Sequence, residues 1–321
     1  MTKTLLVDVR ELTDSQRATI ADAARARGYR AAFASNEAEA EAVAPEAEIL
    51  FSLNAALLKN APKLKWWCVP YAGVDAFLKP ALEDRRDILL SSSSGAYGVT
   101  IAEHIVMVTL MLMRRQMEYT EVVRNGGWRR DLPIRAIRGS RIAVLGAGDI
   151  GREAAVRLRA FGPASVVGVN RSGKNPGDMF DAVVSVDALD DLLPRVDVLI
   201  MALPDTPETR HILDARRLHL LPEDAFIVNV GRGSAIDEAA LAGQLHAGRF
   251  AGVALDVFAR EPLPADDPLR TCPRLLITPH VAGNMTLDYT VARIVELFLE
   301  DFGNYCEGRP LARRVEPGKG Y

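Results

Sequence analysis

Short runs of consecutive apolar residues alternate with amphipathic stretches along most of the chain. In the first third, TLLVDV, EILFSL, LKWWCVP and DILLSSSS alternate with stretches of helical pattern, residues 14–27 and NAALLKN. A second series follows Arg138 and consists of SRIAVLGAG, ASVVGVN, DAVVSV, DVLIMALP, AFIVNVG, GVALDVF and LLITPHVAG. Runs that are apolar on successive residues are typical of strands buried on both faces. The pattern predicts an α/β protein built from βα units on parallel sheets.

The segment between the two series, and the end of the chain, suggest how the molecule is divided. Residues 94–115 have the pattern of a loop followed by a long helix, and RNGGWRRDLP after them is a polar loop. A domain boundary is therefore expected near residue 98. Residues 286–321 contain one amphipathic helix, at 287–305, and no strand after it. This tail is expected to pack back on the first domain.

A glycine-rich turn directly follows the first strand of the second series. Gly146, Gly148 and Gly151 have GxGxxG spacing between that strand and a helix that Gly162 can terminate. In this motif the first glycine makes the tight turn, the second lets the backbone approach a pyrophosphate, and the third allows close helix packing. The free N–H groups at the helix start bind the anion. The predicted cofactor residues here are Gly146, Gly148, Asp149, Ile150 and Gly151.

The end of the next strand has an unusual sequence for a site that binds the ribose. About 20 residues beyond the turn, a dinucleotide site usually carries a carboxylate that accepts a hydrogen bond from the ribose 2′-OH. Here the position is Asn170, followed by Arg171 and Ser172, with Lys174 nearby. A guanidinium binds phosphate through charge-assisted hydrogen bonds. We expect NADP(H) to be preferred, with NAD(H) still possible; the alternative is that Arg171 stacks on the adenine and the protein is indifferent to the phosphate.

Polar residues also follow three other strands of the second series. Arg232 follows NVG, Asp256 and Glu261 lie in ALDVFAREPLP, and His280 ends LLITPH. In an open α/β sheet, ligands bind outside the carboxyl ends of the strands. These side chains are therefore expected at the same edge as the glycine-rich turn.

These residue types suit the interconversion of a 2-oxo acid and a 2-hydroxy acid. His280 is the expected proton donor and acceptor, Glu261 would orient its ring and favour the charged form, and Arg232 would bind the substrate carboxylate and polarise the carbonyl. Each of these residues alone also has a structural interpretation. The catalytic interpretation is favoured because all three are expected at the same edge of the sheet. The other histidines lack such partners and are expected to be structural: His104, His211, His219 and His246.

Composition excludes several function classes. The formal net charge is −3 and there is no basic block, so nucleic acid is not suggested as a partner. The longest apolar run, residues 105–113, is too short to span a bilayer, and the N-terminus lacks the pattern of a signal peptide. Three widely spaced cysteines indicate neither a disulfide framework nor a zinc site. We expect a cytoplasmic protein without a metal, whose partner is a small acid.

Together, the motifs resemble the D-isomer-specific 2-hydroxyacid dehydrogenases over nearly the whole chain. They are YAGVD, IAEH, GAGDIG, ALPDTPETRHIL, NVGRGSAIDEAAL, ALDVFAREPLP and TPHVAG. The resemblance implies two flavodoxin-like or Rossmann-like, doubly wound parallel-sheet domains, with the cofactor domain inserted into the substrate domain. The substrate-binding domain would comprise residues 1–98 and 286–321, and the nucleotide-binding domain residues 99–285. A homodimer built on the inserted domain is also implied.

The resemblance also assigns roles that spacing does not. The family's catalytic triad matches Arg232, Glu261 and His280, and Asp256 would hold the nicotinamide carboxamide. Backbone groups that would bind the substrate carboxylate are those of Ala72, Gly73 and Val74. The implied cofactor site is completed by Leu203, Pro204, Thr209, Val230 and Gly283.

Two departures from the family pattern bear on the ligands. The missing acid at Asn170 matches the NADP(H)-using hydroxypyruvate and glyoxylate reductase branch. After His280 the sequence VAGNMTLDYT is unusual, so Asn284 and Met285 would reshape one pocket wall and leave the identity of the 2-oxo acid open. Candidates for either pocket walls or core positions are Leu53, Tyr71, Tyr97 and Trp128.

Other functions on the same scaffold are weaker alternatives. A dinucleotide-binding corepressor with little turnover would share the triad, but the long tails of such proteins are missing here. A formate-dehydrogenase-like site needs an amide where Glu261 stands. Phosphoglycerate oxidation usually comes with a regulatory domain or strict use of NAD, and neither is expected for this chain.

Overall fold

The computed structural model describes residues 2–75, 85 and 87–316, and within them the chain forms two compact units. The first unit combines Met1–Tyr97 with Asn284–Tyr321, and the second is Gly98–Gly283. Each has one sheet whose described strands all pair in parallel. The predicted α/β fold with two parallel sheets is therefore confirmed. The substrate-binding and nucleotide-binding roles of the two domains stay predictions.

The first sheet has the strand order β2-β1-β3-β4-β5, the flavodoxin-like arrangement. Its strands are β1 (Lys3–Asp8), β2 (Tyr29–Phe33), β3 (Ala47–Ser52), β4 (Trp66–Val69) and β5 (Leu89–Ser92). The helices of this unit include α1 (Asp14–Ala26), α2 (Glu37–Val43) and α10 (Asp288–Cys306). The stretch NAALLKN, expected to be helical, forms a short 3₁₀ helix at Ala55–Asn60 rather than an α-helix.

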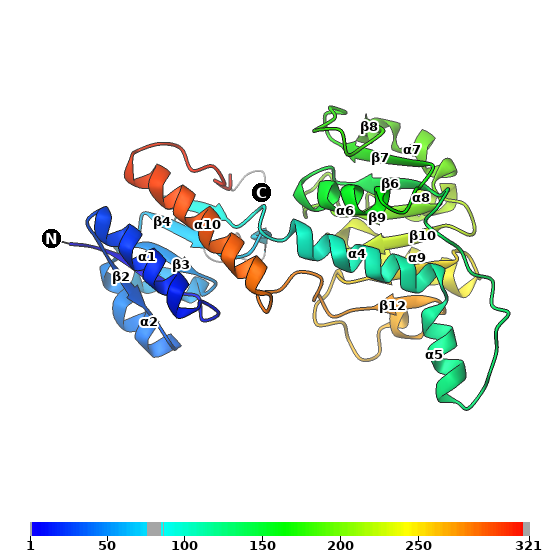
Figure 1. Ribbon diagram of the computed structural model, residues 1–321, viewed down its shortest axis with the longest axis horizontal. Coiled ribbons are helices and arrows are strands. Elements are labelled where there is room, and N and C mark those ends of the chain that lie inside the picture. The colour runs from blue at the N-terminus through cyan, green and yellow to red at the C-terminus, as the bar shows by residue number, and fades with distance from the viewer. Residues whose placement is uncertain (1, 76–84, 86, 317–321) are drawn as a thin grey trace. The chain divides into compact units, whose positions relative to one another are not determined.

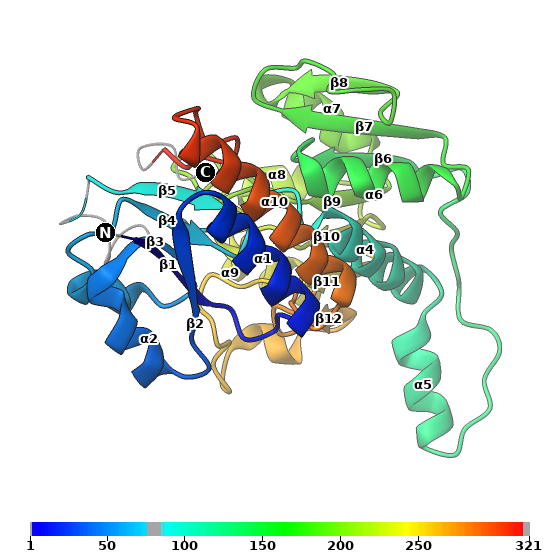
Figure 2. The same cartoon turned by 60° about the vertical axis from the view of Figure 1, so that its left-hand side comes forward.

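Helix α10 joins the first unit although it lies at the far end of the sequence. Its Phe298 ring stacks on Phe51 of β3 at a centroid distance of 4.3 Å and on Trp66 of β4 at 5.6 Å. Figures 1 and 2 both show α10 lying beside α1. Three aromatic rings from strands and helix thus form one continuous apolar layer, which buries the inner face of α10.

The second sheet has seven strands in the order β12-β11-β10-β9-β6-β7-β8. All seven apolar runs of the second series form strands: β6 (Arg141–Leu145), β7 (Ser165–Asn170), β8 (Ala182–Ser185), β9 (Val198–Met201), β10 (Phe226–Asn229), β11 (Gly252–Leu255) and β12 (Leu275–Ile277). The order reverses between β6 and β9, as in a Rossmann fold. Such a reversal marks the expected place of a ligand, at the carboxyl ends of these two strands.

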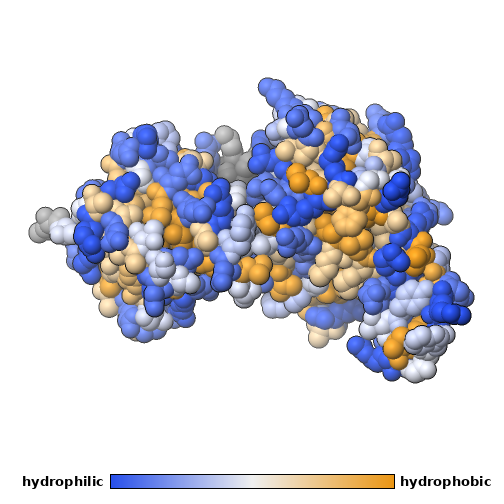
Figure 3. Space-filling view, viewed as in Figure 1, coloured by the Kyte–Doolittle hydropathy of each residue, from blue (hydrophilic) through white to orange (hydrophobic). Residues whose placement is uncertain are grey.

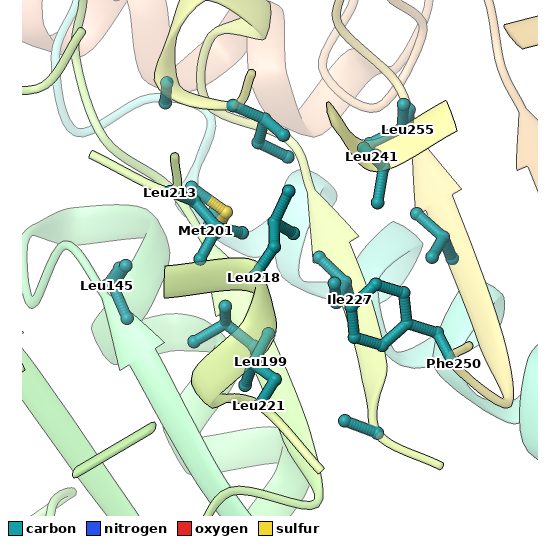
Figure 4. Packing of buried hydrophobic residues seen from close by; sticks show 14 of the residues in the cluster. Leu145, Leu199, Met201, Leu213, Leu218, Leu221, Ile227, Leu241, Phe250 and Leu255 are labelled. Carbon is teal, nitrogen blue, oxygen red and sulfur yellow. The ribbon is translucent and has the colours of Figure 1, made fainter. Parts of the chain in front are cut away.

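Helices cover both faces of the second sheet. On one face, α8 (Ala215–Leu220) and α9 (Glu238–His246) place Leu218 and Leu241 in the core beside Ile227 of β10 (Figure 4). The other face is covered by α4 (Gly98–Met113) and α6 (Asp149–Arg159), which contact β10, β11, β6 and β7. The remaining helices are the short α7 (Leu189–Leu192) and α5 (Gln116–Arg124), and α5 has no buried residue.

Candidate active site

Three loops pack backbone against backbone where the order of the second sheet reverses. A Cβ atom on Gly146, after β6, would lie 2.5 Å from the Ala202 carbonyl oxygen after β9. A Cβ on Gly231, after β10, would lie 2.5 Å from the Leu203 nitrogen. A Cβ on Gly151 would collide with the Gly146 carbonyl. Glycine is therefore required at all three positions, and the ends of β6, β9 and β10 form one tightly packed edge.

The start of α6 has the features of an anion site. Gly148 is the N-cap residue. Within the described residues, this N-cap position makes no side-chain capping hydrogen bond to the first turn of the helix. A Cβ on Gly148 would meet nothing within 4 Å, so the backbone there borders open space. Uncapped N–H groups at a helix start, next to open space, suit the pyrophosphate of a dinucleotide. Asp149 lies in the first turn, with its carboxylate against Gly98 at the start of α4.

The loop after β7 is shaped by Asn170. The Asn170 Oδ1 atom accepts the N–H groups of Ser172 at 3.0 Å and Gly173 at 2.7 Å, and Nδ2 donates to the Lys174 carbonyl at 2.8 Å. Asn170 is thus committed mainly to a local turn. Arg171 and Ser172 are exposed on this turn, and the positive charge of Arg171 contributes to a lowered pKa of Glu208, after the hydrogen bonds made by that carboxylate.

The loop after β9 contains three further predicted cofactor residues. Thr209 donates its hydroxyl hydrogen to the Pro204 carbonyl at 2.6 Å, and its Oγ1 accepts the N–H of Thr206 at 2.9 Å. These bonds close the loop on itself, with Leu203 and Pro204 partly exposed at the sheet edge. Val230, by contrast, is buried, at 6% exposed.

The structure brings His280 and Glu261 into direct contact. His280 Nδ1 lies 2.7 Å from Glu261 Oε2. Because a carboxylate only accepts hydrogen bonds, the proton is on Nδ1, and Nε2 is the ring nitrogen that can exchange a proton with a ligand. Glu261 Oε1 accepts the Phe258 N–H at 2.9 Å. The His280 side chain remains 47% exposed, so a substrate can reach the ring.

Arg232 stands on a turn held by a buried amide. Asn229, the last residue of β10, is 0% exposed; its Oδ1 accepts the Gly231 N–H at 3.1 Å and its Nδ2 donates to the Arg232 carbonyl at 2.9 Å. The Arg232 guanidinium donates to the Gly231 carbonyl at 2.8 Å. Sequence reasoning missed Asn229, although an amide that ends a buried apolar strand was a usable signal.

Asp256 is the centre of a second buried network. Its carboxylate, in a residue 2% exposed, accepts from the Thr278 hydroxyl at 2.5 Å and from the N–H groups of Val281 at 3.0 Å and Ala282 at 2.9 Å. The Asp256 carbonyl accepts the His280 N–H at 2.8 Å. Asp256 therefore holds the turn that carries His280. Oδ1 accepts two of these bonds and Oδ2 one.

The other histidines have structural contacts. His104 Nε2 lies 3.4 Å from Thr278 Oγ1, and burial lowers its pKa against the opposing effect of Asp256. His219 pairs with Gln244, and His246 bonds to the Ala242 carbonyl. His211 is exposed, with its backbone bound to Ser234.

The predicted substrate loop lies in the first unit, after β4. Ala72 and Gly73 are partly exposed, and Val74 is 1% exposed. The preceding Tyr71 is 38% exposed, whereas Tyr97 is 4% exposed and donates its hydroxyl to the Pro70 carbonyl at 2.8 Å. Tyr97 is thus a core residue that holds the loop.

In residues 2–75, 85 and 87–316, no group of three or more His, Cys, Asp or Glu residues is arranged to hold a metal ion. No helix in that part of the chain combines the length and the apolar character needed to cross a bilayer.

Comparisons with known proteins point to one family. The family model described as D-isomer specific 2-hydroxyacid dehydrogenase, NAD binding domain, matches residues 106–282. Glycerate dehydrogenase of Methylorubrum extorquens is 32% identical over 240 residues, which is 72% of this chain and 73% of that protein.

Solved structures resemble the whole chain. A D-isomer specific 2-hydroxyacid dehydrogenase family protein from Aeromonas salmonicida has a TM-score of 0.86 and 33% identity over 99% of this chain and all (100%) of that one. An NADPH-dependent glyoxylate/hydroxypyruvate reductase from Sinorhizobium meliloti, in complex with NADP and sulfate, has a TM-score of 0.81 and 27% identity over 99% and 100% of the two chains.

Proposed function

The chain belongs to the D-isomer specific 2-hydroxyacid dehydrogenase family, whose members are NAD(P)-dependent oxidoreductases, and on that premise we propose that it reduces a 2-oxo acid to the D-2-hydroxy acid with NADPH. The observation that carries the proposal is the contact of 2.7 Å between His280 Nδ1 and Glu261 Oε2. It supplies a proton donor with a fixed tautomer at the same sheet edge as the glycine-rich turn.

The acid–base work is assigned to His280. When bound, the nicotinamide supplies the hydride that the carbonyl carbon of the substrate receives. His280 Nε2 gives its proton to the carbonyl oxygen, and Glu261 stabilises the charged ring before the transfer. In the oxidation direction, neutral His280 takes the proton from the hydroxyl group. Arg232, held on its turn by Asn229, binds the substrate carboxylate and stabilises the negative charge on the oxygen.

The preference for NADPH is supported by the loop after β7. No carboxylate stands at Asn170, so a 2′-phosphate meets no fixed repulsion there, and Asn170 folds the loop so that Arg171 and Ser172 are exposed together. The Sinorhizobium meliloti relative binds NADP. Arg171 supplies the charge that favours the phosphate, and Ser172 a hydroxyl donor.

The substrate class follows from the chemistry and from the relatives. Glycerate dehydrogenase and glyoxylate/hydroxypyruvate reductase act on short 2-oxo or 2-hydroxy acids. Backbone N–H groups of Ala72, Gly73 and Val74 are suited to a carboxylate because they need no side-chain charge. We assign a short 2-oxo acid such as glyoxylate or hydroxypyruvate to this site.

The direct test is an assay of nicotinamide absorbance with purified protein. NADPH and NADH are compared in parallel with glyoxylate, hydroxypyruvate, pyruvate and phenylpyruvate. The proposal predicts turnover that is fastest with NADPH and a short 2-oxo acid. Turnover that favours NADH would contradict the cofactor preference, and tight cofactor binding without turnover on any substrate would contradict the enzymatic role.

We also propose that the protein is a homodimer through its second unit. Helix α5 has no buried residue, Trp128 after it is 84% exposed, and Met107 of α4 is 47% exposed. Figure 3 shows apolar side chains gathered on the face along which α4 runs. A helix of nine residues is marginal in water unless it packs on a partner, and a second copy supplies one.

A further inference from the structure

The segment that carries Glu261 has no regular structure of its own. Phe258–Glu261 follows β11 as a bend, so its conformation depends on what its neighbours bind. The turn of Arg232 packs on it directly, because a Cβ on Gly233 would collide with the Phe258 carbonyl carbon and the Ala259 nitrogen. The contact with Gly233 restricts the backbone of Phe258 and Ala259. The N–H groups of these two residues are held by hydrogen bonds.

Glu238 provides that partner. Its Oε1 atom accepts the Ala259 N–H at 2.7 Å. The neighbouring N–H, that of Phe258, is bound by Glu261 itself at 2.9 Å. Two carboxylates thus hold two successive N–H groups, and the one from Glu261 leaves its second oxygen for His280 at 2.7 Å.

Glu238 is mounted on a rigid element. It is the first residue of α9, after Asp237, whose side chain caps the helix by accepting the Ala240 N–H at 3.0 Å. Leu241 and Leu245 anchor α9 in the core, both at 0% exposed. The hydrogen bond between the Glu238 carboxylate and the Ala259 N–H therefore ties the Ala259 backbone to the start of α9.

The surroundings of Glu238 are costly for a carboxylate. Burial raises the pKa of Glu238, and the charges of Asp267 and Glu261 act in the same direction, while the Ala259 N–H and His211 act against them. An acid also interacts favourably with a helix dipole at an exposed position, so that role alone does not require partial burial. The partly buried position suits a group whose purpose is the bond to Ala259.

We propose that Glu238 is a positioning residue for the catalytic pair: by binding the Ala259 N–H it holds Phe258–Glu261 so that Glu261 meets the His280 ring. This inference rests on the proposed function, in which the pair transfers the proton. Glu238 itself contacts neither the ring nor the substrate in this account. Its effect on the reaction passes entirely through the position of Glu261.

The kinetic test compares two substitutions that differ only in the acceptor. Glu238→Met keeps the length of the side chain and the helix propensity but removes the oxygen, so kcat should fall by about 10-fold, because small misplacements at a catalytic group are expensive. The KM for NADPH should stay unchanged. Glu238→Gln keeps an oxygen acceptor and should recover most of kcat. Gln244→Ala, on the same helix, is the matched control and should behave as the wild type.

Crystal structures of the same variants make the test independent of turnover. In Glu238→Met the distance between His280 Nδ1 and Glu261 Oε2 should exceed hydrogen-bonding range, and in Glu238→Gln it should stay near 2.7 Å. An unchanged pair in Glu238→Met would overturn the inference, as would equal losses of kcat in the Met and Gln variants. If the wild type reduces no 2-oxo acid, the proposed function fails, and the crystal distances alone decide the role of Glu238.

Discussion

At the scale of single residues, the most informative feature is the backbone of His280. Its φ is 54°, in the left-handed region that a residue with a side chain rarely adopts. The Asp256 carbonyl accepts the His280 N–H, and the Asp256 carboxylate accepts the next two N–H groups. A buried aspartate thus maintains a strained conformation, which is common where a side chain must be aimed accurately.

His280→Ala tests the acid–base assignment. Loss of a positioned proton donor should lower kcat by about 10²- to 10⁴-fold, the usual range for general acid catalysis. The dissociation constant of NADPH, measured by fluorescence titration, should hardly change because the proposed pyrophosphate site is the start of α6 and not His280. His219→Ala, at an exposed histidine of α8, is the matched control. A His280→Ala enzyme with normal turnover would remove His280 from the mechanism.

Arg171→Ala tests the cofactor preference. Removing the guanidinium should raise the KM for NADPH by at least about 10-fold, a typical loss for a charge-assisted bond to phosphate, and leave the KM for NADH within about twofold. Arg195→Ala, at an exposed arginine of the same unit, controls for the change in net charge. Equal losses for the two cofactors would instead indicate that Arg171 stacks on the adenine.

At the scale of elements, buried strands and helices could be predicted from the sequence, whereas partly exposed ones at the edge of the first sheet could not. The strands β6 and β9–β11, central in the second sheet, each contain at least three successive apolar residues and were predictable from that pattern. The edge strand β2 and helix α2 were missed. Tyr29–Phe33 is mostly not buried and includes Arg30, and α2 lies in an Ala/Glu-rich stretch without an apolar stripe. Edge elements are stabilised by tertiary contacts that local pattern does not record.

In the candidate site, too, some residues could be predicted from the sequence and others could not. Glycines and polar residues at strand ends could be identified because fixed spacing determines them. Asn229 was missed although it ends a buried apolar run and binds its own turn. Thr278 and Glu238 could not be assigned, because their partners lie in loops that the fold brings together. The contact between Glu238 and Ala259 joins residues 21 positions apart. Such non-local hydrogen bonds determine the geometry of the site, and only the folded chain reveals them.

Gly151→Ala tests the packing of α6 on β6. The new methyl group would collide with the Gly146 carbonyl, so α6 must shift, and the free energy of unfolding should fall by about 1–3 kcal/mol. NADPH binding should weaken as well, because the helix start moves. Gly243→Ala in α9 is the control: a Cβ there meets nothing within 4 Å, and alanine should raise stability slightly. Urea unfolding measures the free energy of unfolding of both variants. Equal values for Gly151→Ala and Gly243→Ala would contradict the close packing of α6 on β6.

At the scale of the whole molecule, exposed apolar residues of the second unit support the proposed homodimer. Figures 1 and 2 show α5 extending away from the second sheet, and Val123 on it is 59% exposed. A stable homodimer buries such residues in the centre of its interface. In the proposed homodimer, α5 of the second unit would lie in the interface.

Val123→Glu tests this association. A charge in a desolvated interface is unfavourable, so light scattering should show a shift from dimer to monomer at micromolar concentration. Gln116→Glu, at an exposed polar position of the same helix, should remain dimeric. A wild type that is monomeric at all concentrations would contradict the homodimer.

In the proposed reaction, one face of the carbonyl carbon of a 2-oxo acid would receive the hydride that NADPH supplies, and His280 would protonate the carbonyl oxygen. The most direct measurement is chiral analysis of the product formed from hydroxypyruvate and NADPH, together with the amount of NADPH oxidised. We expect D-glycerate in an amount equal to the NADPH consumed. Formation of L-glycerate, or NADPH consumed without glycerate, would contradict it.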